Sequence, residues 1–120
     1  MKRILVVEDN EKNMYLMSFI LTKGGYEVIK CGTGEEAVET AVKEKPDLVL
    51  MDIQLPGMDG LEATKKIRES EADGKIPIVA ITSYAMTGDK ERVLAAGCNG
   101  YIEKPINPET FLAEIQRFIK

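Results

Sequence analysis

Histidine is missing from this sequence of 120 residues. Its absence excludes Ser-His-Asp and Cys-His catalysis, histidine-ligated zinc or haem, and a histidine that carries a phosphoryl group. Cysteine is scarce: Cys31 and Cys98 lie far apart and form no C-x-x-C motif, so neither a redox motif nor a metal cluster is expected. We expect two buried thiols in a reducing compartment rather than a disulfide. Chemistry in this protein must therefore use carboxylates, hydroxyls, lysines or these two thiols.

Long apolar runs and excess positive charge are also missing. No segment approaches the ~20 apolar residues that cross a bilayer, and Ile4–Val7 is too short for a signal peptide. The 16 Lys and Arg against 20 Asp and Glu leave a net charge of −4, the wrong sign for binding nucleic-acid phosphates. The 44% of hydrophobic residues is typical of a globular protein. We therefore expect one cytoplasmic domain over residues 1–120, with no nucleic-acid or membrane partner.

Short, continuous apolar runs predict strands that are buried on both faces. Runs of this kind are typical of parallel sheets covered by helices. They are found at Ile4–Val7, Leu48–Met51, Ile76–Ile81 and Tyr101–Ile102. A further candidate strand, Tyr26–Cys31, alternates more and is expected nearer an edge of the sheet.

Segments with helical spacing lie between these runs. The expected helix starts are Asn10, Thr33 or Gly34, Asp59, Thr87, and Asn107 with Pro108. In the fourth of these helices Val93 and Leu94 could belong to an apolar partner surface, but we expect them to cover the sheet. A strand followed by a helix is thus repeated five times. This pattern predicts the α/β class: a doubly wound, five-stranded parallel sheet with right-handed crossovers and helices on both faces.

Polar side chains follow the predicted strands at the edge where parallel sheets bind ligands. Glu8 and Asp9 follow the first strand, and Asp52, Thr82 and Lys104 follow the three strands of the later runs. Three carboxylates at one mouth need counter-charge, and Lys104 supplies a single positive charge, which leaves about −2. Mg²⁺ matches that remainder and prefers hard oxygen ligands, with Mn²⁺ or Ca²⁺ as substitutes.

This set of groups is suited to covalent attack by a carboxylate on a phosphoryl group, which gives an aspartyl phosphate. A metal and a lysine would shield the phosphoryl oxygens as charge shifts during transfer. Each residue also has a plainer alternative. Acidic residues after strands often cap helices, Thr82 alone could be a turn hydroxyl, and Lys104 alone a solvated charge. Their positions at successive strand ends favour a shared site.

Four segments resemble the receiver domain of bacterial two-component response regulators. They are ILVVEDN, DLVLMDIQLPGMDGLEATKKIR, PIVAITSYA and GYIEKPI, and the resemblance covers about residues 2–118. It implies a CheY-like fold with strand order 2-1-3-4-5. It also implies that Asp52 is the phosphoacceptor, and that Glu8, Asp9, Asp52 and the backbone carbonyl of Gln54 hold Mg²⁺. Many members of the family have Asp where this chain has Glu8.

The same resemblance implies roles for residues near the end of the chain. Thr82 and Lys104 would contact the phosphoryl group, and the Lys104–Pro105 peptide bond would be cis. Thr82 and Tyr101 would form a switch that acts on the face made by the fourth helix, fifth strand and fifth helix. Taken alone, Tyr101 would be a half-buried edge aromatic. The implied partners are a histidine kinase or histidine phosphotransfer protein as donor, and a downstream protein target.

Two other functions compete with a phosphorelay switch. A Mg²⁺-dependent aspartyl-phosphate phosphohydrolase needs a second acid two residues after its nucleophile, where this chain has Gln54. A nucleotide- or flavin-binding module needs a glycine-rich loop after the first strand, where this chain has Glu8, Asp9 and Asn10. We therefore expect a switch and not an enzyme.

The chain resembles both small cell-division regulators of the DivK type and hybrid-kinase receivers, and we favour a stand-alone protein over a domain excised from a hybrid histidine kinase.

Overall fold

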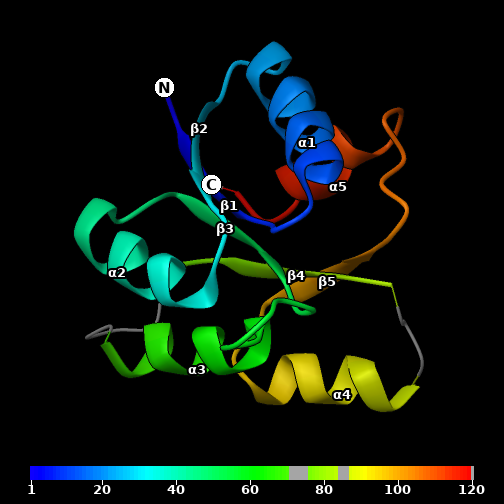
Figure 1. Ribbon diagram of the computed structural model, residues 1–120. Coiled ribbons are helices and arrows are strands. Elements are labelled where there is room, and N and C mark those ends of the chain that lie inside the picture. Colours follow the sequence, from blue (N-terminus) through cyan, green and yellow to red (C-terminus); the bar gives the residue numbers. More distant parts are fainter. Residues whose placement is uncertain (71–75, 84–86, 120) are drawn as a thin grey trace.

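The computed structural model of this chain describes residues 1–70, 76–83 and 87–119. Within these residues the strands are β1 (Arg3–Val7), β2 (Glu27–Cys31), β3 (Leu48–Asp52), β4 (Ile78–Thr82) and β5 (Gly100–Glu103). The helices are α1 (Glu11–Lys23), α2 (Gly34–Glu44), α3 (Gly60–Ser70), α4 (Thr87–Ala95) and α5 (Phe111–Gln116). Strands and helices alternate along the chain as predicted (Figure 1).

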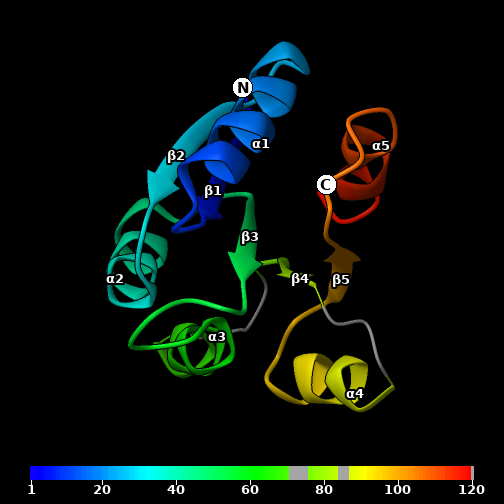
Figure 2. The same ribbon diagram turned by 45° about the vertical axis from the view of Figure 1, so that its right-hand side comes forward.

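The strands form one parallel sheet in the order β2-β1-β3-β4-β5, which confirms the predicted fold class and strand order. Figure 2 shows this order, with β2 and β5 at the two edges. In the register, Val7 of β1 lies opposite Met51 of β3, and Asp52 of β3 lies opposite Ile81 of β4. The carboxyl ends of the central strands therefore meet at one edge of the sheet.

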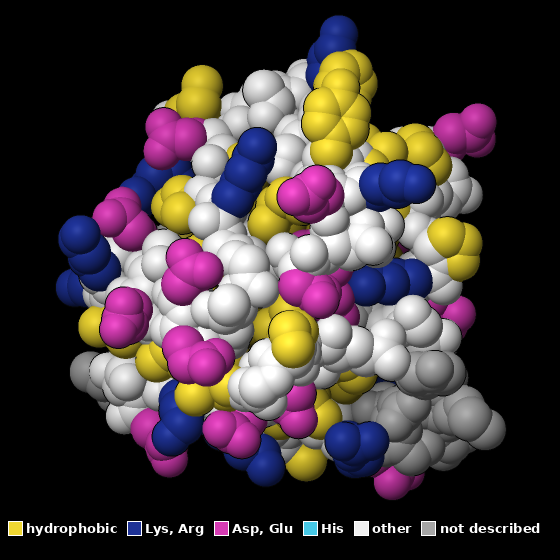
Figure 3. All heavy atoms as spheres, viewed as in Figure 1, with side chains coloured by type: hydrophobic (Ala, Val, Ile, Leu, Met, Phe, Trp, Pro, Cys, Tyr) yellow, Lys and Arg dark blue, Asp and Glu magenta, His cyan; other side chains and the backbone are white. Residues whose placement is uncertain are grey.

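Helices cover both faces of the sheet. Helices α1 and α5 lie on one face, and α2, α3 and α4 lie on the other (Figures 1 and 2). Successive strand residues alternate between two buried clusters: Leu5 and Val7 pack with residues of α2 and α3, whereas Ile4 and Val6 pack with residues of α1 and α5. Because both faces are buried, the central strands are continuously apolar. Figure 3 shows that charged side chains of both signs are spread over the face of the molecule in view.

Three of the five predicted helix starts are confirmed by side-chain caps. Asn10 Oδ1 accepts a hydrogen bond from the Asn13 N–H (3.0 Å), and Thr33 Oγ1 accepts one from the Glu36 N–H (3.1 Å). Asp59 Oδ1 accepts one from the Glu62 N–H (2.9 Å). These bonds satisfy N–H groups that the first turn of a helix leaves without a partner.

Two local predictions are wrong. The last helix begins at Phe111 and not at Asn107, because Asn107 closes a separate turn: its carbonyl accepts from the Thr110 and Phe111 N–H groups. Thr110, at φ −112°, separates that turn from α5. In α4, Val93 is buried against the sheet as expected, but Leu94 points outward and is 46% exposed. One residue step rotates a side chain by about 100° around a helix, and this rotation carries Leu94 from the sheet side of α4 towards solvent.

Both cysteines, Cys31 and Cys98, are free thiols and buried, as predicted. Burial raises the pKa of each thiol above its ordinary value. Among the described residues, no helix has the length and apolar character needed to span a membrane.

Candidate functional site

The carboxyl edge of the sheet brings the predicted site residues together. Asp52 and Thr82 are the last residues of β3 and β4, and Glu8 and Lys104 directly follow β1 and β5. The side chains of Glu8 and Asp52 are almost completely buried, whereas Asp9 is exposed. Residues separated by up to 96 positions in the sequence, 8 to 104, therefore share one mouth.

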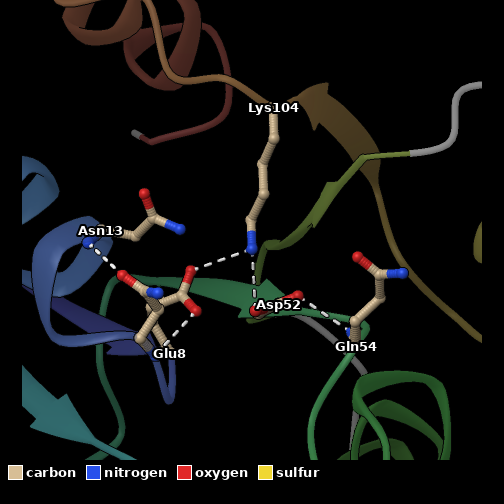
Figure 4. A network of polar contacts seen from close by, with 6 residues as sticks. Glu8, Asn13, Asp52, Gln54 and Lys104 are labelled. Atoms are coloured by element: carbon tan, nitrogen blue, oxygen red, sulfur yellow. Dashed lines mark hydrogen bonds and ion pairs between the residues drawn. The ribbon is translucent and has the colours of Figure 1, made fainter.

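Lys104 lies between the two buried carboxylates. Its Nζ is 3.0 Å from Asp52 Oδ2 and 3.2 Å from Glu8 Oε1 (Figure 4). The second oxygen of each carboxylate is held by a backbone N–H: Gln54 donates to Asp52 Oδ1 (2.9 Å) and Asn10 donates to Glu8 Oε2 (3.2 Å). The orientation of both acids is thus fixed from two sides.

The acidic residues of this mouth are close enough to share a metal ion. One carboxylate oxygen from each of Glu8, Asp9 and Asp52 lies within 4.8 Å of the other two. Glu8 Oε1 is buried and accepts no hydrogen bond among the described residues, although it faces the ammonium of Lys104. Carboxylate oxygens in this arrangement fit a hard cation such as Mg²⁺. Gln54 lies beside Asp52, and the metal-binding role of its carbonyl stays a prediction.

The electrostatics of the mouth reflect this crowding of negative charge. Burial, together with the hydrogen bond and the charge of Asp52, raises the pKa of Glu8 to about 7. Burial alone would lower the pKa of Lys104, but its hydrogen bond to Asp52 and the two negative charges beside it raise that pKa above its ordinary value. Lys104 is therefore a firmly charged ammonium, while Glu8 exchanges its proton near neutral pH.

Thr82 links the mouth to the neighbouring strand β5, on which Tyr101 lies. Thr82 is buried, and its backbone carbonyl accepts a hydrogen bond from the Lys104 N–H (2.7 Å). The Lys104–Pro105 peptide bond is cis. Tyr101 is half-buried on β5, and the ammonium of Lys90 in α4 lies 5.9 Å from the centre of its ring. A hollow beside Tyr101 is lined by residues of α4, β5, α5 and the segment after α5, among them Leu94 and Phe118.

Two supporting residues of the site were not predicted from the sequence. Asn10 was identified only as a helix cap, yet its N–H also holds Glu8. Gly60 begins α3 directly against β3, where an added Cβ would meet the backbone of Asp52 and Ile53. The Asp59-Gly60 pair at a predicted helix start was the only sequence signal for this close approach.

Comparison with known proteins gives the family. The response regulator receiver domain matches residues 4–116. The polar-differentiation response regulator DivK of Brucella ovis is 44% identical over 118 residues, which cover 98% of this chain and 96% of DivK. The chemotaxis protein CheY4 of Vibrio cholerae superposes with a TM-score of 0.93 at 33% identity, over 99% of each chain. The chain therefore belongs to the response regulator receiver domain family.

A second solved relative bears on the metal. The receiver domain of a sensor histidine kinase from Pseudomonas aeruginosa has a TM-score of 0.89 and 38% identity, covers 98% of this chain and 96% of its own, and has a magnesium ion coordinated in its active site cleft. Receiver domains are signalling switches that bind Mg²⁺ at an acidic pocket and interact with kinases and downstream targets. The acidic mouth of this chain is consistent with that family property.

Proposed function

We propose that this chain is a phosphorylation-dependent switch over residues 1–120, in which Asp52 accepts a phosphoryl group from a histidine kinase or a histidine phosphotransfer protein. One observation carries the proposal: the buried Asp52 carboxylate lies 3.0 Å from Lys104 Nζ, within a cluster of three carboxylates. An acidic nucleophile beside a fixed cation is what phosphoryl transfer to aspartate needs.

The transfer requires one bond to form and one to break. A carboxylate oxygen of Asp52 attacks the phosphorus, the phosphorus–nitrogen bond of the donor phosphohistidine breaks, and its electron pair stays on the imidazole. Lys104 and Thr82 then contact the phosphoryl oxygens. Bound Mg²⁺, or Mn²⁺ in its place, would be held by Glu8, Asp9, Asp52 and the Gln54 carbonyl and would offset the charge of those oxygens.

The output would be a change in protein contacts. The phosphoryl group adds acceptor oxygens beside Thr82 and Lys104, whose backbones are already joined by a hydrogen bond between the ends of β4 and β5. Contacts available only in the phosphorylated state shift an existing equilibrium. Tyr101, on β5 beside Lys90 of α4, would report this shift to a target protein at the α4-β5-α5 face. We place the protein in the cytoplasm, where its two free thiols stay reduced.

The proposal is tested by incubation with acetyl phosphate and Mg²⁺, followed by intact-mass measurement. We expect the added mass of one phosphoryl group, its loss in Asp52→Asn, and its loss when EDTA removes the metal. Asp59→Asn is the matched control, because Asp59 caps α3 and lies outside the acidic cluster. Equal labelling of wild type and Asp52→Asn would overturn the assignment. Steady turnover of a small phosphoester would instead identify a phosphohydrolase.

A further inference from the structure

An aromatic pair is exposed on α1, away from the acidic mouth. Tyr15 and Phe19 are 70% and 49% exposed, and their rings stack with centroids 6.2 Å apart. The ammonium of Lys23 lies 5.5 Å from the centre of the Phe19 ring. Figure 3 shows hydrophobic side chains projecting over α1 at the top of the view, beside basic ones. The other exposed large hydrophobic residues in the described chain are far apart in the sequence: Met1 before β1, Val42 on α2 and Leu94 on α4.

A groove of about 330 Å³ lies between this pair and the edge strand β2. We call it the α1–β2 groove, and its lining residues are Tyr15, Ser18, Phe19, Thr22, Val28 and Lys30. Ser18 is only 7% exposed, and its Oγ has no hydrogen-bond partner among the described residues. A buried hydroxyl without a partner is destabilising, and here it belongs to a residue that lines the groove.

The β2 strand adds unmet backbone groups. It pairs with β1 alone in the described sheet, and Figure 2 shows it at the sheet edge. The Glu27 N–H donates to Lys2, and the Cys31 carbonyl accepts from Glu8, so the odd-numbered residues of β2 face β1. Backbone groups alternate along a strand, which directs the N–H and carbonyl groups of Val28 and Lys30 outward. These two residues also line the α1–β2 groove.

The groove is positively charged, unlike the molecule as a whole. Among the described residues, Lys30 is the only charged one in the lining and no carboxylate lines the groove, while Lys23 lies over the ring of Phe19. Glu11 and Glu27 are exposed on the same two elements but do not line it. The whole chain carries a net charge of −4. Two copies paired through this surface would bring their lysines together, so charge complementarity favours an acidic partner.

We propose that the α1–β2 groove is a docking site for an acidic peptide segment of another protein. The segment would extend β2 as an added strand, with backbone hydrogen bonds to Val28 and Lys30. An apolar side chain would pack on Tyr15 and Phe19, and a carboxylate would pair with Lys30. This inference does not rest on phosphorylation of Asp52, which lies at the carboxyl edge of β3.

A display library of short random peptides, selected on the wild-type protein, provides the test. We expect the selected peptides to combine Asp or Glu with aromatic residues, and to shift the amide NMR signals of Val28 and Lys30. The variant Tyr15→Ala/Phe19→Ala/Lys30→Glu should bind them at least about tenfold more weakly, because a few anchor residues contribute most of the affinity of such an interface. The matched control Val42→Ala/Lys43→Glu changes an exposed apolar residue and a lysine on α2, and should bind normally.

Several results would overturn the proposal. Selected peptides that are basic, or that bind the triple variant as tightly as the wild type, exclude an acidic ligand in this groove. Wild-type binding to phosphatidylglycerol vesicles that the triple variant loses, without acidic peptides, would make the patch a membrane contact. Concentration-dependent sedimentation abolished by the same variant would make it a contact between copies. Labelling of Asp52 by acetyl phosphate should be unchanged in the variant, so failure here is separate from failure of the proposed function.

Discussion

At the mouth of the sheet, the negative charge of the carboxylates exceeds the positive charge that neighbouring residues supply. Lys104 Nζ is shared between Glu8 Oε1 and Asp52 Oδ2, at 3.2 and 3.0 Å, and Asp9 adds a third carboxylate nearby. Burial and the neighbouring Asp52 raise the pKa of Glu8 to about 7, so this carboxyl keeps its proton up to neutral pH. A cation that enters this mouth would take the place of that proton, so metal binding and the protonation of Glu8 are coupled.

The first residue-scale prediction concerns pH. With metal removed by EDTA, Glu8 should make the free energy of unfolding fall as pH rises from about 4.5 to about 7. Between these values the folded state keeps the Glu8 proton that the unfolded chain has released, so deprotonation favours unfolding. The loss is at most about 3 kcal/mol. Urea unfolding at pH 5 and pH 7.5 measures it, and Glu8→Gln should remove this component. Parallel pH profiles for the two proteins would contradict the prediction.

A second prediction concerns the shared cation. Lys104→Met keeps most of the aliphatic stem but removes the ammonium, which leaves Glu8 and Asp52 facing each other. At pH 8 without metal we expect a loss of about 2 kcal/mol, below the usual cost of breaking a buried pair because Glu8 can take up a proton. The pKa of Glu8 should rise further, since the charge of Lys104 lowers it now.

Urea unfolding and NMR titration of the Glu8 carboxyl measure the two effects of Lys104→Met. Lys104→Arg keeps the charge and should retain most of the stability and of the Glu8 pKa. A Met variant that matches the Arg variant in both measurements would show that the charge of Lys104 is not what stabilises this mouth.

At the scale of elements, local signals predicted most of the fold. Continuous apolar runs gave the buried strands, and the caps Asn10, Thr33 and Asp59 gave three helix starts because each acts on N–H groups only three residues away. The start of α5 was missed, since Asn107 also closes an ordinary turn. The sequence analysis placed Lys104 at one mouth with the three carboxylates, but its direct contact with Glu8 could not be predicted, because that contact depends on where β5 ends relative to β1 across the sheet.

An element-scale prediction tests how closely α3 must approach β3. In Gly60→Ala the new Cβ would meet the carbonyl of Asp52 and the Cα of Ile53, which are backbone atoms and cannot rotate away. We expect a loss of about 1–3 kcal/mol in the free energy of unfolding, as in other overpacked sites. Labelling by acetyl phosphate should also fall, because the shift displaces the residues around Asp52.

Gly32→Ala provides the control for Gly60→Ala. The nearest atom to a Cβ at Gly32 is Glu36 Oε1, a side-chain atom 4.0 Å away, so this variant should keep both stability and labelling. Urea unfolding and intact mass compare the two. Equal behaviour of the two variants would show that α3 can move away from β3 without cost to the site.

At the scale of the whole molecule, the acidic mouth exists only when the chain is folded. Glu8 and Asp9 are more than 40 residues from Asp52 in sequence, 9 to 52, and the order β2-β1-β3 brings them together. A metal that needs all three carboxylates therefore binds the folded state in preference to the unfolded chain. The proposed output face α4-β5-α5 and the α1–β2 groove lie away from the acidic mouth, so each surface can be altered without removing the three carboxylates.

The whole-molecule prediction is that Mg²⁺ stabilises the fold, and more strongly at pH 8 than at pH 5.5. Preferential binding to the folded state gives about 2.7 kcal/mol when the ion is at 100 times its Kd. The pH dependence follows from Glu8, which holds a proton below about pH 7 and then competes with the metal. Thermal unfolding across a Mg²⁺ series measures the effect, with NaCl at equal ionic strength as the control. Asp9→Asn should lose most of the stabilisation at little cost to the apo fold, because Asp9 is exposed. If NaCl raises the unfolding temperature as much as Mg²⁺, or if Asp9→Asn responds like the wild type, the three carboxylates do not act as one metal site.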